Sequence, residues 1–280
     1  MKGFINLGNT CYFNACLQCL FQIPTLSNHL ITVDVQEYPC DFVKEYRHLV
    51  REFWIRDKHK TYCDPSKIIR IFRQKFKRFD NCAEHDAQEV LLCMLDLLHK
   101  GTKNHKSTRL VDNKEWRVKS DSLIKDIFYG QIEKRIIYSG GESTTRENCG
   151  SVMLNPVKDT SLELLLKEFG KDEVLEGYRD HENRKHLVAV IQHTLINRPN
   201  IMIFCFNMFV RKVRIKVPEF FGTHKLIALC MHVGNLSNGH YVAYTKHKNE
   251  WYFKDDDVVI KKRPTFNDSY YFCIFKNSLN

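Results

Sequence analysis

The pattern of apolar residues changes near the middle of this chain, and that change limits the folds it can adopt. In the first hundred residues, apolar side chains recur every three or four positions, which is the period of an amphipathic helix. The clearest run contains Phe42, Val43, Tyr46, Leu49, Val50, Phe53 and Trp54. The second half instead carries short runs rich in β-branched and aromatic residues, separated by turn signals. Helices followed by mostly antiparallel strands predict an α+β fold.

Local signals suggest where individual elements begin and end. Asp64 and Pro65 predict a helix with an N-cap followed by proline at its first position. Asp86 predicts the start of another helix, which Gly101 would follow directly. Ser161 is expected to cap a helix over residues 163–169. Strands are expected over residues 186–195, 201–210, 225–233, 241–246 and 270–275.

Composition excludes several classes of protein. With 43% hydrophobic residues among 280 the chain is too apolar for disorder, yet no run approaches the roughly 20 apolar residues that span a membrane. The first six residues lack the apolar core of a signal peptide. Eleven irregularly spaced cysteines, an odd number, argue against a disulfide framework. We therefore expect an intracellular protein of the reducing cytoplasm or nucleus, without a membrane partner.

The net charge of +10 raises the question of a nucleic-acid partner. The basic residues are scattered along the chain, and no expected helix or strand carries an organised basic face. The sequence therefore does not favour nucleic acid as a partner, and a basic nucleic-acid-binding protein stays the alternative from another class.

The most informative segment is residues 6–15, which read NLGNTCYFNA. Thr10 can cap a helix that begins there, so Cys11 is expected in the first helical turn. Unpaired amides and the helix dipole favour an anion at that position, which predicts a lowered thiol pKa and a nucleophilic cysteine. Asn6 lies on the preceding loop, where its amide could donate to a developing oxyanion. An ordinary buried cysteine after a capped turn would give the same local pattern.

A second segment could supply the base for such a nucleophile. His240 follows Gly239 at the head of an alternating strand, and a turn near Asn249 would pair this strand with one that ends at residues 255–257, three aspartates. This hairpin would place an aspartate beside one imidazole nitrogen and leave the other facing a thiol. Taken separately these are common structural features. Together with Cys11 they supply a nucleophile, a base and an orienting carboxylate.

Residues 6–20 and 239–259 resemble the cysteine and histidine boxes of the ubiquitin-specific proteases, the large papain-like family of cysteine deubiquitinases. Residues 86–89 are similar to the short acidic motif of the family, and residues 159–169 to the helix after its first finger strands. The resemblance runs from about residue 4 to residue 276. It implies one catalytic domain over residues 1–280 with a papain-like fold. A helical thumb would span about 1–115, and the fingers and palm about 116–280.

The resemblance also implies a binding mode, a reaction and six functional residues. Ubiquitin would be gripped by the fingers, with its tail in a groove between thumb and palm. The enzyme would hydrolyse the peptide or isopeptide bond after the C-terminal glycine of ubiquitin through an acyl-enzyme. Cys11 would be the nucleophile, His240 the base, Asp255 the residue that orients the base, Asn6 the oxyanion donor, Asp256 an assisting residue, and Asp86 a contact for the basic ubiquitin tail.

The chain departs from the family in two places. Many members hold a structural zinc in the fingers with two Cys-x-x-Cys pairs, whereas residues 138–141 read YSGG and residues 178–181 read YRDH. We expect no finger zinc and no cofactor, and we expect Cys16 and Cys19 to pack within the first helix. Glu84 and His85 precede the acidic motif where the family usually has glutamines. This difference could alter how the loops beside the site close.

Two alternatives share the fold of this family. One is a protease for a ubiquitin-like modifier with the same Gly-Gly tail, and the other is a non-catalytic ubiquitin-binding module. The presence of both Cys11 and His240 argues against the module, because such decoys usually lose one of them. No accessory module is evident, so substrate choice is expected to come from the catalytic surface or from a regulatory protein partner. We expect a monomer.

Overall fold

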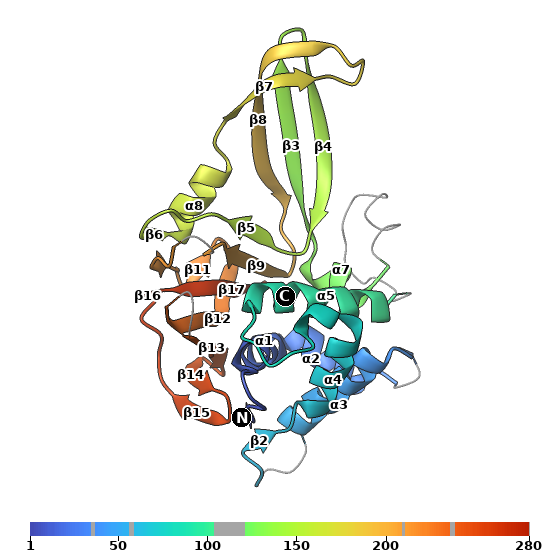
Figure 1. Ribbon diagram of the computed structural model, residues 1–280, viewed down its shortest axis with the longest axis vertical. Helices are drawn as coiled ribbons and strands as arrows, with labels where there is room; N and C mark the ends of the chain where they lie inside the picture. The colour runs from blue at the N-terminus through green and yellow to red at the C-terminus, as the bar shows by residue number, and fades with distance from the viewer. Residues whose placement is uncertain (35–36, 56–58, 104–120, 209–210, 236–238, 280) are drawn as a thin grey trace.

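Figure 1 shows the computed structural model, which describes residues 1–280 except 35–36, 56–58, 104–120, 209–210, 236–238 and 280. Helices from the first part of the chain pack beside a large sheet from the last part, and a smaller sheet projects away from both. The predicted α+β class is confirmed. The expected thumb boundary near residue 115 lies outside the described residues. No helix in the described ranges is long and apolar enough to cross a membrane.

Most of the helices lie in the first half of the chain. α1 is central, because every one of its residues is buried, and Cys16 and Cys19 pack in the core as expected. The run of apolar residues between 42 and 54 forms α3, as predicted. The helices are α1 (Cys11–Phe21), α2 (Pro24–Thr32), α3 (Asp41–Trp54), α4 (Ser66–Lys75), the 3-10 helix η1 (Lys77–Phe79), α5 (Ala87–Gly101), α7 (Leu123–Phe128) and α8 (Leu162–Phe169).

Helix starts follow the sequence signals within about one residue. Asp64 accepts a hydrogen bond from the backbone amide of Ser66 at 2.8 Å, and α4 begins at Ser66 with Pro65 as its N-cap. The predicted position of the proline is therefore wrong by one residue. The hydroxyl of Ser161 accepts from the amide of Leu164 at 3.2 Å, so the predicted cap of α8 is confirmed.

Gly101 is the last residue of α5 and does not follow the helix as predicted. Its role is close packing. A Cβ atom at this position would lie 2.4 Å from Val43 Cγ2 and 2.9 Å from Cys40 Cβ, which is too close for any other residue type. The glycine therefore allows α5 to approach α3, while Thr102 forms the C-cap.

The large sheet has the order β15-β14-β13-β12-β17-β9-β5, with β11 paired to β12, and all its pairs are antiparallel except β5 with β9. We call it the central sheet. α1 packs against β12, β13 and β14. Its strands are β5 (Val152–Leu154), β9 (Ile201–Phe206), β11 (Phe220–Phe221), β12 (His224–Gly234), β13 (Gly239–His247), β14 (Glu250–Asp255), β15 (Val258–Lys261) and β17 (Tyr270–Asn277).

The projecting sheet has the order β4-β3-β8-β7, and we call it the finger sheet. It consists of β3 (Gly130–Tyr138), β4 (Gly141–Cys149), β7 (Glu173–Arg179) and β8 (Lys185–Asn197). Two small sheets complete the fold: β1 (Gly3–Phe4) with β2 (Tyr62–Cys63), and β6 (Thr160–Ser161), β10 (Ile215–Lys216) and β16 (Asn267–Asp268).

The five expected strands correspond to β8, β9, β12, β13 and β17. The strand expected over residues 201–210 ends at Phe206, and residues 209–210 lie outside the described residues.

Candidate catalytic site

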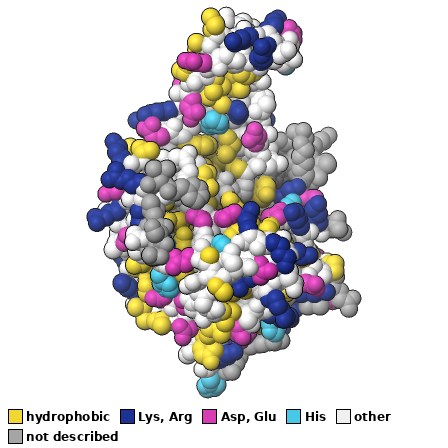
Figure 2. All heavy atoms as spheres, viewed as in Figure 1, with side chains coloured by type: hydrophobic (Ala, Val, Ile, Leu, Met, Phe, Trp, Pro, Cys, Tyr) yellow, Lys and Arg dark blue, Asp and Glu magenta, His cyan; other side chains and the backbone are white. Residues whose placement is uncertain are grey.

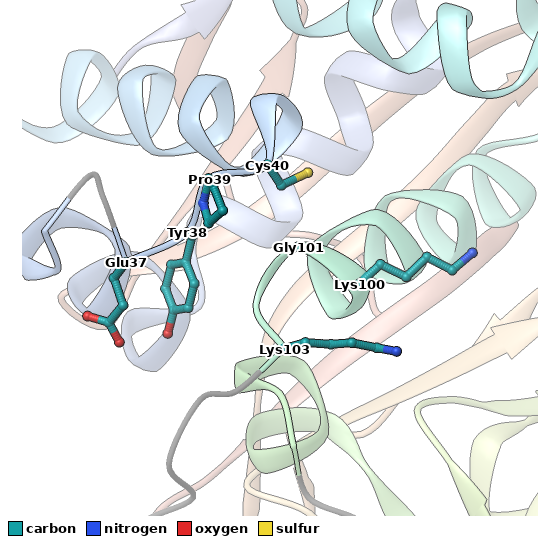
Figure 3. A pocket seen from close by; sticks show the side chains of 7 residues that line it. All are labelled: Glu37, Tyr38, Pro39, Cys40, Lys100, Gly101 and Lys103. Atoms are coloured by element: carbon teal, nitrogen blue, oxygen red, sulfur yellow. The ribbon is translucent and has the colours of Figure 1, made fainter.

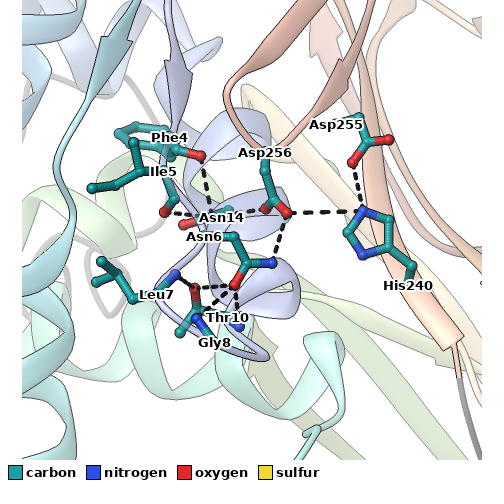
Figure 4. Close-up of polar contacts among 10 residues, drawn as sticks. All are labelled: Phe4, Ile5, Asn6, Leu7, Gly8, Thr10, Asn14, His240, Asp255 and Asp256. Atoms are coloured by element: carbon teal, nitrogen blue, oxygen red, sulfur yellow. Dashed lines mark hydrogen bonds and ion pairs between the residues drawn. The ribbon is translucent and has the colours of Figure 1, made fainter.

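Cys11 is the first residue of α1, as predicted, and its side chain is almost fully buried. Thr10 is the N-cap residue, but its hydroxyl makes no cap bond. That hydroxyl accepts from the amide of Leu7 at 2.9 Å and donates to Asn6 Oδ1 at 3.2 Å (Figure 4). The predicted capping role of Thr10 is therefore wrong, because its side chain shapes the loop before the helix. The first amides of α1 receive no cap from it.

Asn6 is fixed at both ends of its amide. Its Oδ1 accepts from the backbone amides of Gly8 and Thr10, at 3.0 and 3.2 Å. Its Nδ2 donates to Asp256 Oδ2 at 2.7 Å (Figure 4). Asn14, one turn into α1, donates its Nδ2 to the other oxygen of Asp256 at 2.8 Å. Each carboxylate oxygen of Asp256 thus accepts a hydrogen bond from a side-chain amide, and one of these amides is that of Asn6, the candidate oxyanion donor.

The predicted histidine hairpin is confirmed. β13 and β14 pair antiparallel, and Lys248 and Asn249 join them with φ values of 46° and 67°, as a tight two-residue hairpin turn requires. His240 Nε2 lies 2.5 Å from Asp255 Oδ1 and 3.9 Å from Asp256 Oδ2. In Figure 4 the second ring nitrogen points away from both carboxylates. Asp255 is therefore the carboxylate that pairs with the imidazole.

The thiol of Cys11 lies within hydrogen-bond reach of the backbone of Tyr241, near the start of β13. Burial raises the pKa of Cys11, and hydrogen bonds from the backbone amides of Tyr241 and Tyr12 oppose that rise. Tyr241 directly follows His240, so these contacts bring the helix start and the histidine strand together. The lowered pKa expected from the helix position is wrong, because desolvation outweighs the amides. The carboxylates of Asp256 and Glu84 also raise the pKa of the thiol.

Asp86 begins α5 as predicted. Its Oδ1 accepts from the amides of Gln88 and Glu89 at 2.7 and 3.1 Å, which makes it the N-cap. Burial raises the pKa of Asp86, and these two amides oppose the rise. Gln88 is buried and donates its side-chain amide to the carbonyl of Tyr271 at 2.7 Å and to that of Phe206. Gln88 therefore joins α5 to the central sheet.

Sequence reasoning assigned no role to Asn14 or Gln88 in organising this site. Both are buried polar residues within helices whose other inward positions are mostly apolar. A polar residue at such a position needs a partner, so a polar interruption of an apolar face was the signal available in the sequence.

The tip of the finger sheet carries residues 138–141 and 178–181, where the family often has zinc ligands. The turn at Gly140, with φ of 98°, joins β3 to β4. The buried carboxylate of Asp180 accepts from Arg184 Nε and from His186 Nε2, both at 3.0 Å. The Tyr138 ring lies 4.4 Å from the ring of His186. Within the described ranges, the one set of three side chains placed to share a metal ion is His240, Asp255 and Asp256.

Other surface features lie away from these residues. Figure 3 shows a pocket of about 250 Å³ between the segment before α3 and the end of α5. It is lined by Glu37, Tyr38, Pro39, Cys40, Lys100, Gly101 and Lys103, none of which is a candidate catalytic residue. In Figure 2, hydrophobic side chains are visible on the finger sheet. The exposed apolar residues of this sheet include Ile137, Val174, Leu187 and Val188.

The fold resembles solved structures of known proteins. The SAGA DUB module of Ubp8, Sgf11, Sus1 and Sgf73 bound to monoubiquitin matches with a TM-score of 0.82 and 19% identity, over 99% of this chain and 69% of that chain. The Ubp8/Sgf11/Sus1/Sgf73 module bound to ubiquitin aldehyde matches with a TM-score of 0.81 and 18% identity, over 99% and 69% of the two chains.

Curated relatives cover nearly the whole chain. Ubiquitin carboxyl-terminal hydrolase 25 of Arabidopsis thaliana is 27% identical over 92% of this chain and 44% of its own length. Ubiquitin carboxyl-terminal hydrolase Usp2 of Drosophila melanogaster is 27% identical over 92% and 32%. The chain therefore spans less than half the length of these two relatives. Residues 2–273 match the family described as "Ubiquitin carboxyl-terminal hydrolase". This chain belongs to the ubiquitin carboxyl-terminal hydrolase family.

Proposed function

We propose that this protein is a cysteine-type deubiquitinase that hydrolyses the peptide or isopeptide bond after the C-terminal glycine of ubiquitin. The observation that carries this proposal is the hydrogen bond between Cys11, at the start of α1, and the backbone of Tyr241. Tyr241 directly follows His240, whose imidazole lies 2.5 Å from Asp255. The family to which the chain belongs supports the same reaction. We propose residues 1–280 as one catalytic domain with thumb, palm and fingers.

His240 acts as the base in this proposal. Asp255 engages Nε2 and so selects the tautomer with its proton on that nitrogen, which leaves Nδ1 free to take the proton of Cys11. Because burial raises the pKa of Cys11, the thiol is protonated in the resting enzyme at neutral pH. Proton transfer to His240 therefore accompanies the attack of sulfur on the glycine carbonyl.

Asn6 stabilises the oxyanion that forms when sulfur attacks. Its Nδ2 carries two hydrogens. One donates a hydrogen bond to Asp256 Oδ2, so the second is available to donate to the oxyanion. The amides at the start of α1 add to this site. The tetrahedral intermediate then collapses, the C–N bond breaks, and His240 gives its proton to the leaving amine. The same histidine next takes a proton from water, whose oxygen cleaves the thioester and releases ubiquitin.

The ubiquitin tail is proposed to pass Asp86. Both capping bonds of this residue end on Oδ1, so Oδ2 can accept from the arginines or amides of an extended basic tail. The exposed apolar residues of the finger sheet offer a surface for the folded part of ubiquitin.

We also propose a reducing intracellular location for this protein, supported by its eleven unpaired cysteines. We propose that it is a monomer that neither a membrane nor nucleic acid recruits. Ubp8 occurs with Sgf11, Sus1 and Sgf73 in the solved structures, and a regulatory protein partner is proposed here by analogy.

The test is labelling by ubiquitin that carries a C-terminal electrophile, together with turnover of a fluorogenic ubiquitin substrate. Cys11→Ala is expected to abolish both, while ubiquitin binding is retained. Cys82→Ala, which changes an exposed cysteine, is the matched control and is expected to label normally. Parallel probes built on ubiquitin-like modifiers test the first alternative, and binding without turnover would favour the non-catalytic module. Labelling that persists in Cys11→Ala would overturn the assignment.

A further inference from the structure

The loop over residues 80–86, between η1 and α5, is fastened to the start of α1. Asn9, in the loop before α1, donates its side-chain amide to the carbonyl of Cys82 at 2.8 Å. The ring of His85 packs edge-on against Tyr12 at 5.3 Å and against Phe79 at 4.9 Å between ring centroids. This loop therefore has a defined place beside the residues that carry Cys11.

Glu84 extends from this loop to the other side of the site. Its Oε2 accepts from the backbone amide of Gly239 at 3.3 Å, and Gly239 is the first residue of β13, directly before His240. The charge of Glu84 also acts on two side chains nearby, because it raises the pKa of both Cys11 and His232. Its carboxylate thus contacts the start of the histidine strand, and its charge acts on the thiol.

The other side of Gly239 is closed by His232. A Cβ atom on Gly239 would lie 2.2 Å from Cε1 and Nε2 of that ring, so the ring packs directly on the glycine backbone. Burial lowers the pKa of His232 to about 4, so the ring is neutral at neutral pH. A neutral ring does not offset the charge of Glu84. Gly239 is therefore held between a neutral ring and a carboxylate.

We propose that Glu84 is a positioning residue with two effects on the catalytic pair. Its hydrogen bond fixes the backbone that carries His240, and its negative charge adds to the effect of burial in disfavouring the Cys11 thiolate. The first effect favours alignment of the base, and the second restrains the nucleophile. The assignment of the pair rests on the proposed function, whereas the effect of Glu84 on the thiol can be measured without ubiquitin.

Two substitutions separate these effects. Glutamine has nearly the same shape as glutamate, and its amide oxygen can still accept from Gly239, so Glu84→Gln removes only the charge. Glu84→Ala removes the charge and the hydrogen bond. The matched control is Asp80→Asn, which neutralises an exposed carboxylate that lies at the start of the same loop and pairs with Lys77. Thermal unfolding of each variant checks that the fold is kept.

The first measurement is the rate at which neutral iodoacetamide alkylates Cys11, followed across pH by mass spectrometry of the Cys11 peptide. Both Glu84 variants are expected to shift the midpoint to lower pH by roughly 0.5 units, which is about threefold faster alkylation below the midpoint. Asp80→Asn is expected to match the wild-type protein. An unchanged midpoint in Glu84→Gln would overturn the electrostatic part of the proposal.

The second measurement is steady-state turnover of a ubiquitin substrate. Glu84→Gln keeps the hydrogen bond and loses the charge that restrains the thiol, so its kcat is expected to equal or exceed that of the wild-type protein. Glu84→Ala is expected to have a kcat about tenfold below that of Glu84→Gln with little change in KM, because His240 is no longer held in place. Equal kcat values for the two variants would overturn the positioning part. If the wild-type protein turns over no ubiquitin substrate, the proposed function fails, and the alkylation profiles still decide the effect of Glu84 on the thiol.

Discussion

Replacing Asp256 with asparagine is expected to slow turnover while the pair of His240 and Asp255 stays intact. Each carboxylate oxygen of Asp256 accepts from one amide, Oδ2 from Asn6 at 2.7 Å and Oδ1 from Asn14 at 2.8 Å. An asparagine has a single acceptor oxygen. Because Asn14 is buried, its hydrogen bond is the costlier one to lose, so the new oxygen should face Asn14. The new NH₂ group would then face the NH₂ group of Asn6 and displace it.

The magnitude follows from the kind of bond that is lost. A hydrogen bond to a charged acceptor contributes about 1.5–3 kcal/mol. If this whole free energy serves to position Asn6 in the transition state, its loss should lower kcat roughly 10- to 150-fold. KM should change little, because the oxyanion exists only after attack. The contact between His240 and Asp255 should be kept, because these side chains lie 2.5 Å apart whereas Asp256 is 3.9 Å from the ring. Loss of the Asp256 charge should move the titration of the Cys11 thiol to lower pH, because that charge raises the pKa of the thiol.

The assay is steady-state turnover across pH, with Asp257→Asn as the control for a change of charge at the neighbouring exposed position. Asn6→Ala tests the route of the effect. If Asp256 acts through Asn6, the double variant Asn6→Ala/Asp256→Asn should be no slower than Asn6→Ala alone. The reasoning would be refuted if Asp256→Asn kept kcat within about twofold, or if the losses of the two single variants simply multiplied.

Three further predictions concern the surroundings of the site. Asp180→Asn weakens the cluster at the finger tip, so KM for ubiquitin should rise while kcat is kept; a lower kcat in steady-state assays would contradict this. Lys254 is buried without a hydrogen-bond partner, and burial lowers its pKa to about 7. Below that pH the folded protein must bury a charged ammonium group, so the free energy of unfolding is lowest there and rises as the pH increases from about 7. Lys254→Met should therefore raise the Tm by roughly 3–5 °C near pH 6 and by less near pH 9, as calorimetry can show. Gly239→Ala places a methyl group against the His232 ring and should lower kcat about tenfold or more, because the backbone of β13 must move and His240 moves with it. An unchanged kcat would show that β13 accepts the methyl group without displacing His240.

The histidine hairpin could be predicted because its information is local. Alternating residues on either side of a short turn fix both the pairing and the side on which residue 240 lies, and the structure has this register. The first strands of the finger sheet had no such signal. β4 reads GESTTRENC and is largely exposed, so no apolar alternation marks it as a strand. α7 has six residues, too few for a helical period to be recognised.

The protonation of Cys11 could not be predicted from the sequence, because two opposing effects act on it. The helix start and its amides are local and favour the thiolate, and a reader of the sequence can see them. Desolvation and the charges of Glu84 and Asp256 come from tertiary contacts, 73 and 245 positions away, and together they outweigh the amides. The sign of a thiol pKa shift in such a site therefore follows from burial as much as from helix position.

Residues 3–5 also contact the candidate site, a role for which their sequence carries no signal. The amide of Phe4 donates to the carbonyl of Asp256 at 2.8 Å, and a Cβ on Gly3 would lie 2.4 Å from that oxygen. β1 therefore presses against the two-residue turn between β14 and β15, where Asp256 has a φ of 49°. Asn14 connects the same elements, since its amide reaches the carbonyl of Ile5 at 3.1 Å as well as Asp256. The contacts that place Asn6, the proposed oxyanion donor, are therefore continuous with those between residues 3–5 and the turn at Asp256.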